Sequence, residues 1–181
     1  AGFLADAGAR VVLVARRQDR LDALVDSIKR DGKEAVAIAA DLSDVENVSK
    51  IAERCQKDFG KVHILVNAAG INPRQPADDV TPQSWNQTIQ LNLSTPFFFA
   101  QALVPGMKAA GYGRILNVIS TSVREPIPNL GVSNTVRGAM ASWSKTLAGE
   151  LPPGITINNL LPGLTDTERL DALRSAIAQK R

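Results

Sequence analysis

The strongest constraint on the fold is a regular alternation of short apolar runs with longer amphipathic stretches. The first apolar run, residues 11–14, precedes a segment in which Leu21, Leu24, Val25 and Ile28 recur at helical spacing. The same order recurs after the apolar runs at 35–40, 62–66, 115–119 and 155–161. Strands alternating with helices of this length indicate repeated βαβ units. The sequence therefore predicts an α/β fold with a doubly wound parallel sheet covered by helices on both faces.

Capping residues predict where the helices begin and end. Asp41 and Ser43 are candidate start residues for a helix that closes at Gly60. Thr81, followed by proline, predicts the start of one long helix that continues to about Met107. An irregular segment of about ten residues precedes Thr81, and loops of this length inside a compact domain are often functional.

Composition places the chain among globular proteins. The 181 residues, of which 44% are hydrophobic and 22% charged, predict a single domain over residues 1–181. A net charge of +3 without a block of basic residues gives no reason to expect nucleic-acid binding, and no apolar run is long enough to cross a membrane. Cys55, the one cysteine, lies on a helical apolar stripe and is predicted to be a buried packing residue. One cysteine allows neither an internal disulfide nor a cysteine cluster for metal, and it favours a cytoplasmic location.

Small and polar residues follow each predicted strand. Because the carboxyl ends of parallel strands form the ligand crevice of such folds, these residues are candidate binding residues. The alternative for each of them alone is ordinary turn chemistry. The residues are Arg16 and Arg17, Asp41 and Leu42, Asn67 to Gly70, Ser120, and Pro162 with Gly163.

Four segments resemble the short-chain dehydrogenase/reductase family over essentially the whole chain. Residues 65–70 (LVNAAG) resemble the strand end of the family, and residues 91–93 (LNL) resemble the helix that carries its asparagine. Residues 113–120 (GRILNVIS) resemble the strand that delivers the catalytic serine. Residues 155–167 resemble the later strand and the proline-glycine turn of the family. As a whole, the chain is most similar to the 3-oxoacyl-acyl-carrier-protein reductase-like members of the family.

The resemblance implies a dinucleotide cofactor. Family members that prefer NAD carry an acidic residue where this chain has Ala15, and Arg16 follows it, so the resemblance favours NADP over NAD. Asp41 could instead be a helix cap. Arg17 could share the role of Arg16, or both arginines could be solvated surface charges. The implied cofactor-binding residues are Arg16, Arg17, Asp41, Leu42, Asn67, Ala68, Ala69, Gly70, Arg137, Pro162, Gly163 and Thr167, with no metal ligand among them.

The resemblance also implies catalytic roles for Ser120 and Asn92, which could otherwise serve only local hydrogen bonding. The Tyr-x-x-x-Lys pair of the family falls on Ser133 and Arg137 here, thirteen and seventeen residues after Ser120. A serine is a weaker acid than a phenol, and a guanidinium essentially never loses its proton. The alternatives for this pair are a helix N-cap for Ser133 and an ordinary ion pair for Arg137.

The resemblance further implies that a strand and a glycine-rich phosphate turn precede Ala1 and that another strand follows Arg181, in a parent protein about a third longer. The implied first strand would lie between the strands at Val11 and Val62, so this chain is expected to form two half-sheets with unpaired interior edges. The helices at Thr81 and Ser133 pack between subunits in the family, which implies a homodimer or homotetramer.

Two functions are consistent with these observations. The first is an NADP-dependent oxidoreductase that interconverts a ketone or 3-oxoacyl group and an alcohol by hydride transfer. The second is a dinucleotide-binding protein with impaired chemistry, acting as a sensor or a partner subunit, which the replaced Tyr-x-x-x-Lys pair motivates.

Overall fold

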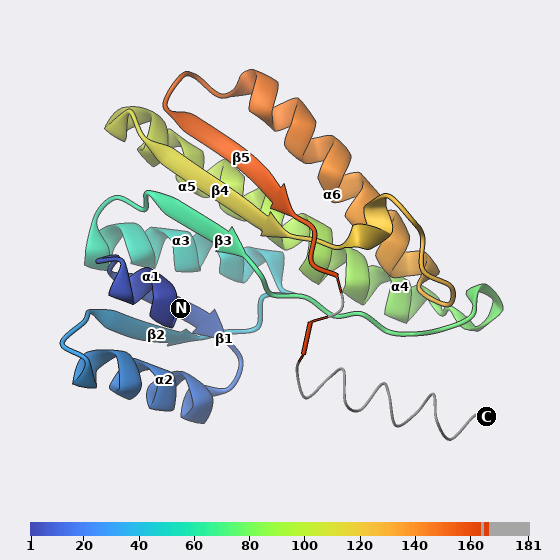
Figure 1. The fold of residues 1–181 in the computed structure, drawn as a ribbon, viewed down its shortest axis with the longest axis horizontal. Helices are drawn as coiled ribbons and strands as arrows, with labels where there is room; N and C mark the ends of the chain where they lie inside the picture. Colours follow the sequence, from blue (N-terminus) through green and yellow to red (C-terminus); the bar gives the residue numbers. More distant parts are fainter. Residues whose placement is uncertain (164, 167–181) are drawn as a thin grey trace.

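The computed structural model describes residues 1–163 and 165–166, and strands and helices alternate along them as predicted (Figure 1). None of the helices within these residues is both long and apolar enough to cross a membrane. The strands are β1 (Val11–Ala15), β2 (Ala35–Ala39), β3 (Ile64–Asn67), β4 (Gly113–Val118) and β5 (Ile155–Leu160). The helices are α1 (Gly2–Asp6), α2 (Gln18–Arg30), α3 (Val45–Phe59), α4 (Pro82–Ile89), α5 (Thr95–Ala110) and α6 (Gly131–Glu150), with short helices η1 (Ala77–Asp79), η2 (Gln90–Ser94) and η3 (Thr121–Val123).

The strands form two parallel sheets. In one, β1 pairs with β2; in the other, β4 lies between β3 and β5. The arrowheads of β1, β3, β4 and β5 point toward the same side of the molecule in Figure 1, so their carboxyl ends share one edge. The predicted division into two half-sheets is therefore confirmed, because β1 and β3 each pair on one side only.

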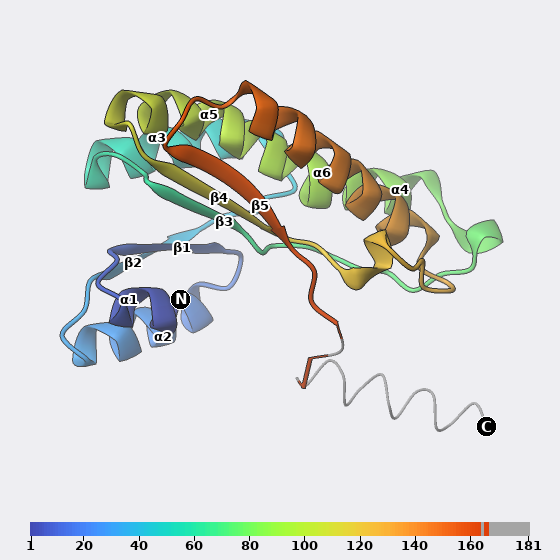
Figure 2. The ribbon, with the colours of Figure 1, turned by 45° about the horizontal axis from the view of Figure 1, so that its top comes forward.

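Helices cover the two sheets unequally. Figure 2 shows α1 and α2 against one side of the β1–β2 sheet, while α3, α5 and α6 lie on the opposite side of the molecule. The predicted doubly wound arrangement, with helices on both sides, is therefore present when the two sheets are taken together, whereas the β3–β4–β5 sheet has helices on one face only within the described residues. Ile64, Val66 and Leu160 on its strands are 42%, 38% and 51% exposed, because α1 and α2 cover the other sheet.

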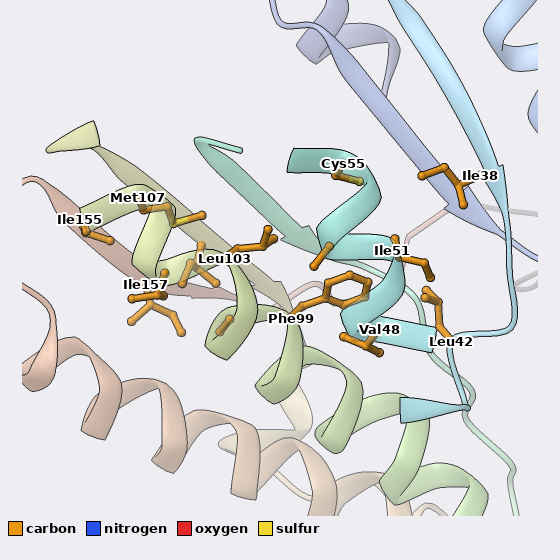
Figure 3. Close-up of a cluster of buried hydrophobic side chains, with 14 residues drawn as sticks. Ile38, Leu42, Val48, Ile51, Cys55, Phe99, Leu103, Met107, Ile155 and Ile157 are labelled. Atoms are coloured by element: carbon orange, nitrogen blue, oxygen red, sulfur yellow. The ribbon is translucent and has the colours of Figure 1, made fainter. Parts of the chain in front are cut away.

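The main core joins both sheets to α3 and α5. Val48 and Ile51 of α3 pack in one cluster with Phe99 and Met107 of α5 (Figure 3). Ile115 of β4 belongs to the same cluster. Ile38 of β2 belongs to the same cluster, so one hydrophobic contact surface connects the sheets although no strand pairing does. A smaller second cluster gathers Ala5, Val25, Ile28 and Ala35 under α1 and α2. Leu24, predicted to share the stripe of α2, is 40% exposed.

The helix start predicted at Asp41 and Ser43 is wrong by a few residues. Asp44 caps α3, and its side chain accepts a hydrogen bond from the amide of Glu46 at 3.0 Å. Asp41 instead accepts two hydrogen bonds from Ser43 in the turn before the helix. The predicted end at Gly60 is confirmed, with φ of 78° at that residue.

The long helix predicted from Thr81 is three helical segments in direct succession. Thr81 caps α4 as predicted, accepting a hydrogen bond from the amide of Ser84 at 3.1 Å. A π-helical segment, η2, then joins α4 to α5. Segments of this kind are often found at functional sites, and Asn92 lies in this one.

Candidate active site

Ser133 and Arg137 meet at the carboxyl end of β4. Ser133 is the third residue of α6 and is 1% exposed. Its Oγ accepts a hydrogen bond from Nε of Arg137 at 3.2 Å, one helical turn along. Nη1 of Arg137 also donates to the carbonyl oxygen of Val118 at 3.4 Å, which ties α6 to the end of β4. The helix N-cap alternative for Ser133 is wrong, since α6 begins at Gly131.

Ser120 lies two residues beyond that carbonyl. The Oγ of Ser120 accepts a hydrogen bond from the amide of Ser122 at 3.1 Å and so caps η3. The backbone is extended at Ser120 and turns sharply after it, which places the hydroxyl at the edge of the sheet. Ser120 and the hydrogen-bonded pair of Ser133 and Arg137 therefore all lie near the last residues of β4.

Asn92 fastens the loop after β3 to the π-helical segment. Its Nδ2 donates to the carbonyl oxygen of Ile71 at 2.7 Å, and its Oδ1 accepts from the amide of Ile71 at 2.9 Å. A Cβ at Gly70 would lie 3.2 Å from the same Oδ1, so this contact favours glycine there. The side chain of Asn92 therefore fixes the position of the loop, and both its amide nitrogen and its amide oxygen are hydrogen-bonded to Ile71.

The loop after β3 presents small residues at the strand end. Ala68, Ala69 and Gly70 are all exposed where a flat ligand could lie against the backbone. Asn67 behaves differently, because its Nδ2 donates to Oδ1 of Asn117 on the neighbouring strand at 2.8 Å. The side chain of Asn67 thus holds β3 against β4 beneath the candidate site.

Asn117 is the centre of a buried polar network that sequence reasoning missed. Its Oδ1 accepts from Asn67, and its Nδ2 donates to Oγ of Ser144 on α6 at 3.0 Å and to Oδ1 of Asn159 on β5 at 3.3 Å. The side chain is 0% exposed. The three asparagines are direct partners in the strand register. An asparagine inside the apolar run of β4 was the one available signal of this network.

The residues after β1 supply exposed positive charge. Arg16 and Arg17 are both exposed, and Arg17 occupies the N-cap position of α2 without a side-chain capping bond. Asp41 lies close enough to Arg16 for their charges to interact. The pKa of Asp41 is lowered mainly by the hydrogen bond from the amide of Ser43, then by the Ser43 hydroxyl, with a smaller contribution from Arg16.

Leu42 does not join this group. Its side chain is buried in the main core beside α3, as Figure 3 shows, and its carbonyl oxygen accepts a hydrogen bond from the hydroxyl of Thr95. The Thr95 bond ties the turn after β2 to the start of α5, just beyond the π-helical segment.

The turn after β5 closes the site on its far side. The amide of Thr121 donates to the carbonyl oxygen of Pro162 at 3.2 Å, which holds this turn beside η3. Gly163 is exposed next to it. Thr167, predicted to contact the cofactor, lies outside the described residues.

Cys55 and His63 lie away from this edge. Cys55 is buried on α3 as predicted, and burial raises the pKa of its thiol. His63 precedes β3 at the opposite end of the strand, where its ring centroid is 6.2 Å from that of Tyr112. Within the described residues no group of three or more histidine, cysteine, aspartate or glutamate side chains could hold a metal ion.

The arrangement fits a dinucleotide along the shared edge of the strands. The small residues after β3 leave backbone open to a flat ligand, and Arg16 with Arg17 offers charge for a phosphate group. At the other end, two hydroxyl groups and one guanidinium lie near the last residues of β4. Such a group can bind a carbonyl oxygen and stabilise negative charge that develops on it.

Known proteins resemble this chain in sequence and in structure. The family model of the short chain dehydrogenases matches residues 1–178. A probable galactose dehydrogenase of Rhizobium meliloti is 35% identical over 164 residues, which cover 90% of this chain and 64% of that protein. The chain thus spans somewhat less than two thirds of the length of this relative.

Solved structures agree with this match. The L-sorbose reductase of Gluconobacter frateurii, complexed with NADPH and L-sorbose, superposes with a TM-score of 0.93 at 30% identity, covering 98% of this chain and 68% of that one. A 3-oxoacyl-acyl-carrier-protein reductase of Agrobacterium tumefaciens with bound NADP has a TM-score of 0.91 at 25% identity, covering 99% and 70%. Because the family model matches residues 1–178, nearly the whole chain, the chain belongs to the short-chain dehydrogenase family.

Proposed function

We propose that the protein carrying this chain is an NADP-dependent oxidoreductase that interconverts a ketone and a secondary alcohol. The observation that supports this most is the group formed by Ser120, Ser133 and Arg137 at the end of β4. The comparison structures with NADPH or NADP, together with the exposed Arg16 and Arg17, favour NADP as the cofactor. The residues that we expect to contact the cofactor follow strands β1, β2, β3 and β5.

Bound NADPH would supply the hydride, and the residues of this chain would manage the substrate oxygen. Ser120 and Ser133 donate hydrogen bonds to the carbonyl oxygen, and the positive charge of Arg137 stabilises the negative charge that grows there. Ser133 would give its hydroxyl proton to the substrate oxygen, and because both oxygens are aliphatic, their acidities differ little. The proton that Ser133 loses is replaced from solvent water, and the hydroxide left is neutralised in solvent, so one ketone, one hydride and one proton give one alcohol. Arg137 orients Ser133 through the Nε–Oγ bond but does not transfer the proton, because it stays charged.

This chemistry defines the reacting group of the substrate and not the rest of the molecule. A simple ketone and the ketone of a 3-oxoacyl chain would both be suitable substrates. Like other members of the family the protein would act as a homodimer or homotetramer in the cytoplasm, without nucleic-acid or membrane partners.

The test is an NADPH oxidation assay of the full-length protein with a panel of ketones. We expect turnover that falls at least about tenfold in Arg137→Met, since a charged donor beside the developing oxyanion is lost. Lys145→Met is the matched control, because Lys145 is an exposed cation on the same helix. Wild-type protein that binds NADPH but reduces no ketone would overturn the proposal. Equal rates in Arg137→Met and wild type would remove Arg137 from the mechanism.

A further inference from the structure

The hydroxyl of Thr95 joins two parts of the candidate cofactor surface. Its Oγ1 donates to the carbonyl oxygen of Leu42 in the turn after β2, and it lies 3.0 Å from the carbonyl oxygen of Gln90 in the π-helical segment. A hydroxyl has one proton, so the two carbonyl oxygens share a single donor. The side chain of Thr95 is 3% exposed, which shields this hydrogen bond from water.

The bond to Leu42 connects the turn after β2 to a distant part of the chain. The other hydrogen bonds described for this turn are local, because Asp41 accepts from the amide and the hydroxyl of Ser43. Thr95 lies 53 positions after Leu42 and begins α5, the helix that packs on the three-stranded sheet through Phe99 and Met107. The turn after β2 is therefore held in place by a helix that belongs to the other sheet.

The same residue closes the π-helical segment that carries Asn92. The amide of Thr95 donates to the carbonyl oxygen of Gln90, which is the bond from residue i+5 to residue i that defines a π turn. Asn92, three residues before Thr95, holds the loop after β3 through its two hydrogen bonds with Ile71. Thr95 therefore links the turn after β2 with the loop after β3, two segments that leave different sheets.

We propose that Thr95 is a positioning residue for the cofactor: its hydroxyl sets the distance between the turn after β2 and the loop after β3, across which a dinucleotide would lie. The inference rests on the proposed function, because it takes NADPH as the ligand of this edge. Thr95 is buried and acts through Leu42 and Asn92 rather than by touching the cofactor. One hydrogen bond fixes one point and does not replace strand pairing between the sheets, so its loss weakens binding without abolishing it.

The test is a fluorescence titration of the full-length protein with NADPH, in wild type and in Thr95→Val. Valine has nearly the shape of threonine but lacks the hydroxyl, and the amide of residue 95 still donates to Gln90. We expect the Kd for NADPH to rise about tenfold, which corresponds to about 1.4 kcal/mol. With saturating NADPH, kcat for a ketone should stay within about threefold of wild type, because Ser120 and Ser133 lie on other elements.

Thr88→Val is the matched control. Thr88 is 0% exposed, and its hydroxyl donates to the carbonyl oxygen of Ser84, one turn earlier in α4, at 2.8 Å. The same atom is removed from an equally buried bond that stays within one helix, so the Kd for NADPH should change by less than about threefold.

A second pair of variants separates the hydroxyl from the shape of the side chain. Thr95→Ser keeps the donor and should bind NADPH nearly as tightly as wild type. Thr95→Cys has a side chain of similar size but only a weak donor, so it should bind NADPH as weakly as Thr95→Val. This pair also decides the question if Thr95→Val does not fold.

The outcomes separate this inference from the function on which it rests. A Kd in Thr95→Val within about threefold of wild type overturns the inference, and so does an equal rise in Thr88→Val or in Thr95→Ser. A kcat that falls as much as the affinity for NADPH also overturns it, since the hydroxyl would then act on more than the cofactor. If the protein binds NADPH but reduces no ketone, the proposed function fails, and the Kd values still decide the role of Thr95. If wild type does not bind NADPH, both fail.

Discussion

At the scale of single residues, Ser133 and Arg137 act as one unit at the end of β4. The side chain of Ser133 is 1% exposed, and Arg137 donates hydrogen bonds to both its hydroxyl and the carbonyl of Val118. A positive charge therefore lies at the end of β4, next to a hydroxyl that is a much weaker acid than a phenol. Under the proposed function, stabilisation of the substrate oxygen would depend more on this charge than on the acidity of one group.

Hydrogen bonds from Ser43 lower the pKa of the Asp41 carboxyl below the ordinary value of 3.8, which makes a testable difference to stability. A carboxyl with a lowered pKa in the folded state stabilises the fold above its unfolded pKa, and this stabilisation is lost as the pH falls through the folded pKa. We expect Asp41→Ala to reduce the free energy of unfolding at pH 7 by less than about 1 kcal/mol, since the group is exposed. The difference should shrink toward pH 3.

Urea unfolding of both proteins at several pH values between 7 and 3 measures this difference. Ser43→Ala is the matched control: it removes the hydroxyl donor but keeps the amide donor, so its effect should have the same pH dependence and a smaller size. A difference between wild type and Asp41→Ala that stays constant across this range would contradict the assignment.

At the scale of elements, β4 and α6 are joined by the network around Asn117. The network spans β3, β4 and β5 through three asparagines in register and reaches α6 through Ser144. Ser144 lies seven residues, or two helical turns, beyond Arg137 on the same helix. The network therefore fixes the helix that carries Ser133 and Arg137 against the strand that leads to Ser120.

Asn117→Ala tests this link. The change leaves the amide of Asn67 and the oxygen of Asn159 with fewer buried partners, so the free energy of unfolding should fall by roughly 1–3 kcal/mol. Asn158→Ala is the control, because Asn158 is exposed on the adjacent strand and should change stability by less than about 0.5 kcal/mol. Urea unfolding compares the two variants. Equal losses in the free energy of unfolding would show that the buried hydrogen bonds of Asn117 contribute no more to stability than an exposed asparagine does.

The elements themselves were predictable where one local pattern decides them. Short apolar runs gave all five strands, and Thr81 and Gly60 gave correct helix ends. The π-helical segment was not predictable, because residues 90–94 read as ordinary helix and only the contact between Asn92 and Ile71 distinguishes them. The asparagine network could not be predicted for a similar reason, because the strand register brings together residues about forty to fifty positions apart in the sequence.

At the scale of the whole molecule, the candidate cofactor surface is divided between two sheets. Arg16 follows a strand of the two-stranded sheet, whereas Ala68 to Gly70 follow a strand of the three-stranded sheet. No strand pairing joins the sheets within the described residues; the hydrophobic cluster around α3 and α5 does. Side-chain packing alone defines distances across this division less sharply than a hydrogen-bonded ladder would.

We therefore expect the 181-residue chain alone to bind NADPH weakly, with a Kd above about 100 μM, or less than roughly 5.5 kcal/mol of binding free energy. A dinucleotide that contacts both sheets must fix their relative position when it binds, and this ordering opposes binding. Titration followed by NADPH fluorescence measures the affinity, with Arg16→Met as the comparison. The variant should weaken what binding remains, because Arg16 is one of the two exposed arginines that we propose bind a phosphate group of NADPH. A Kd in the micromolar range for this chain would show that the two sheets already hold the cofactor surface in place without a strand between them.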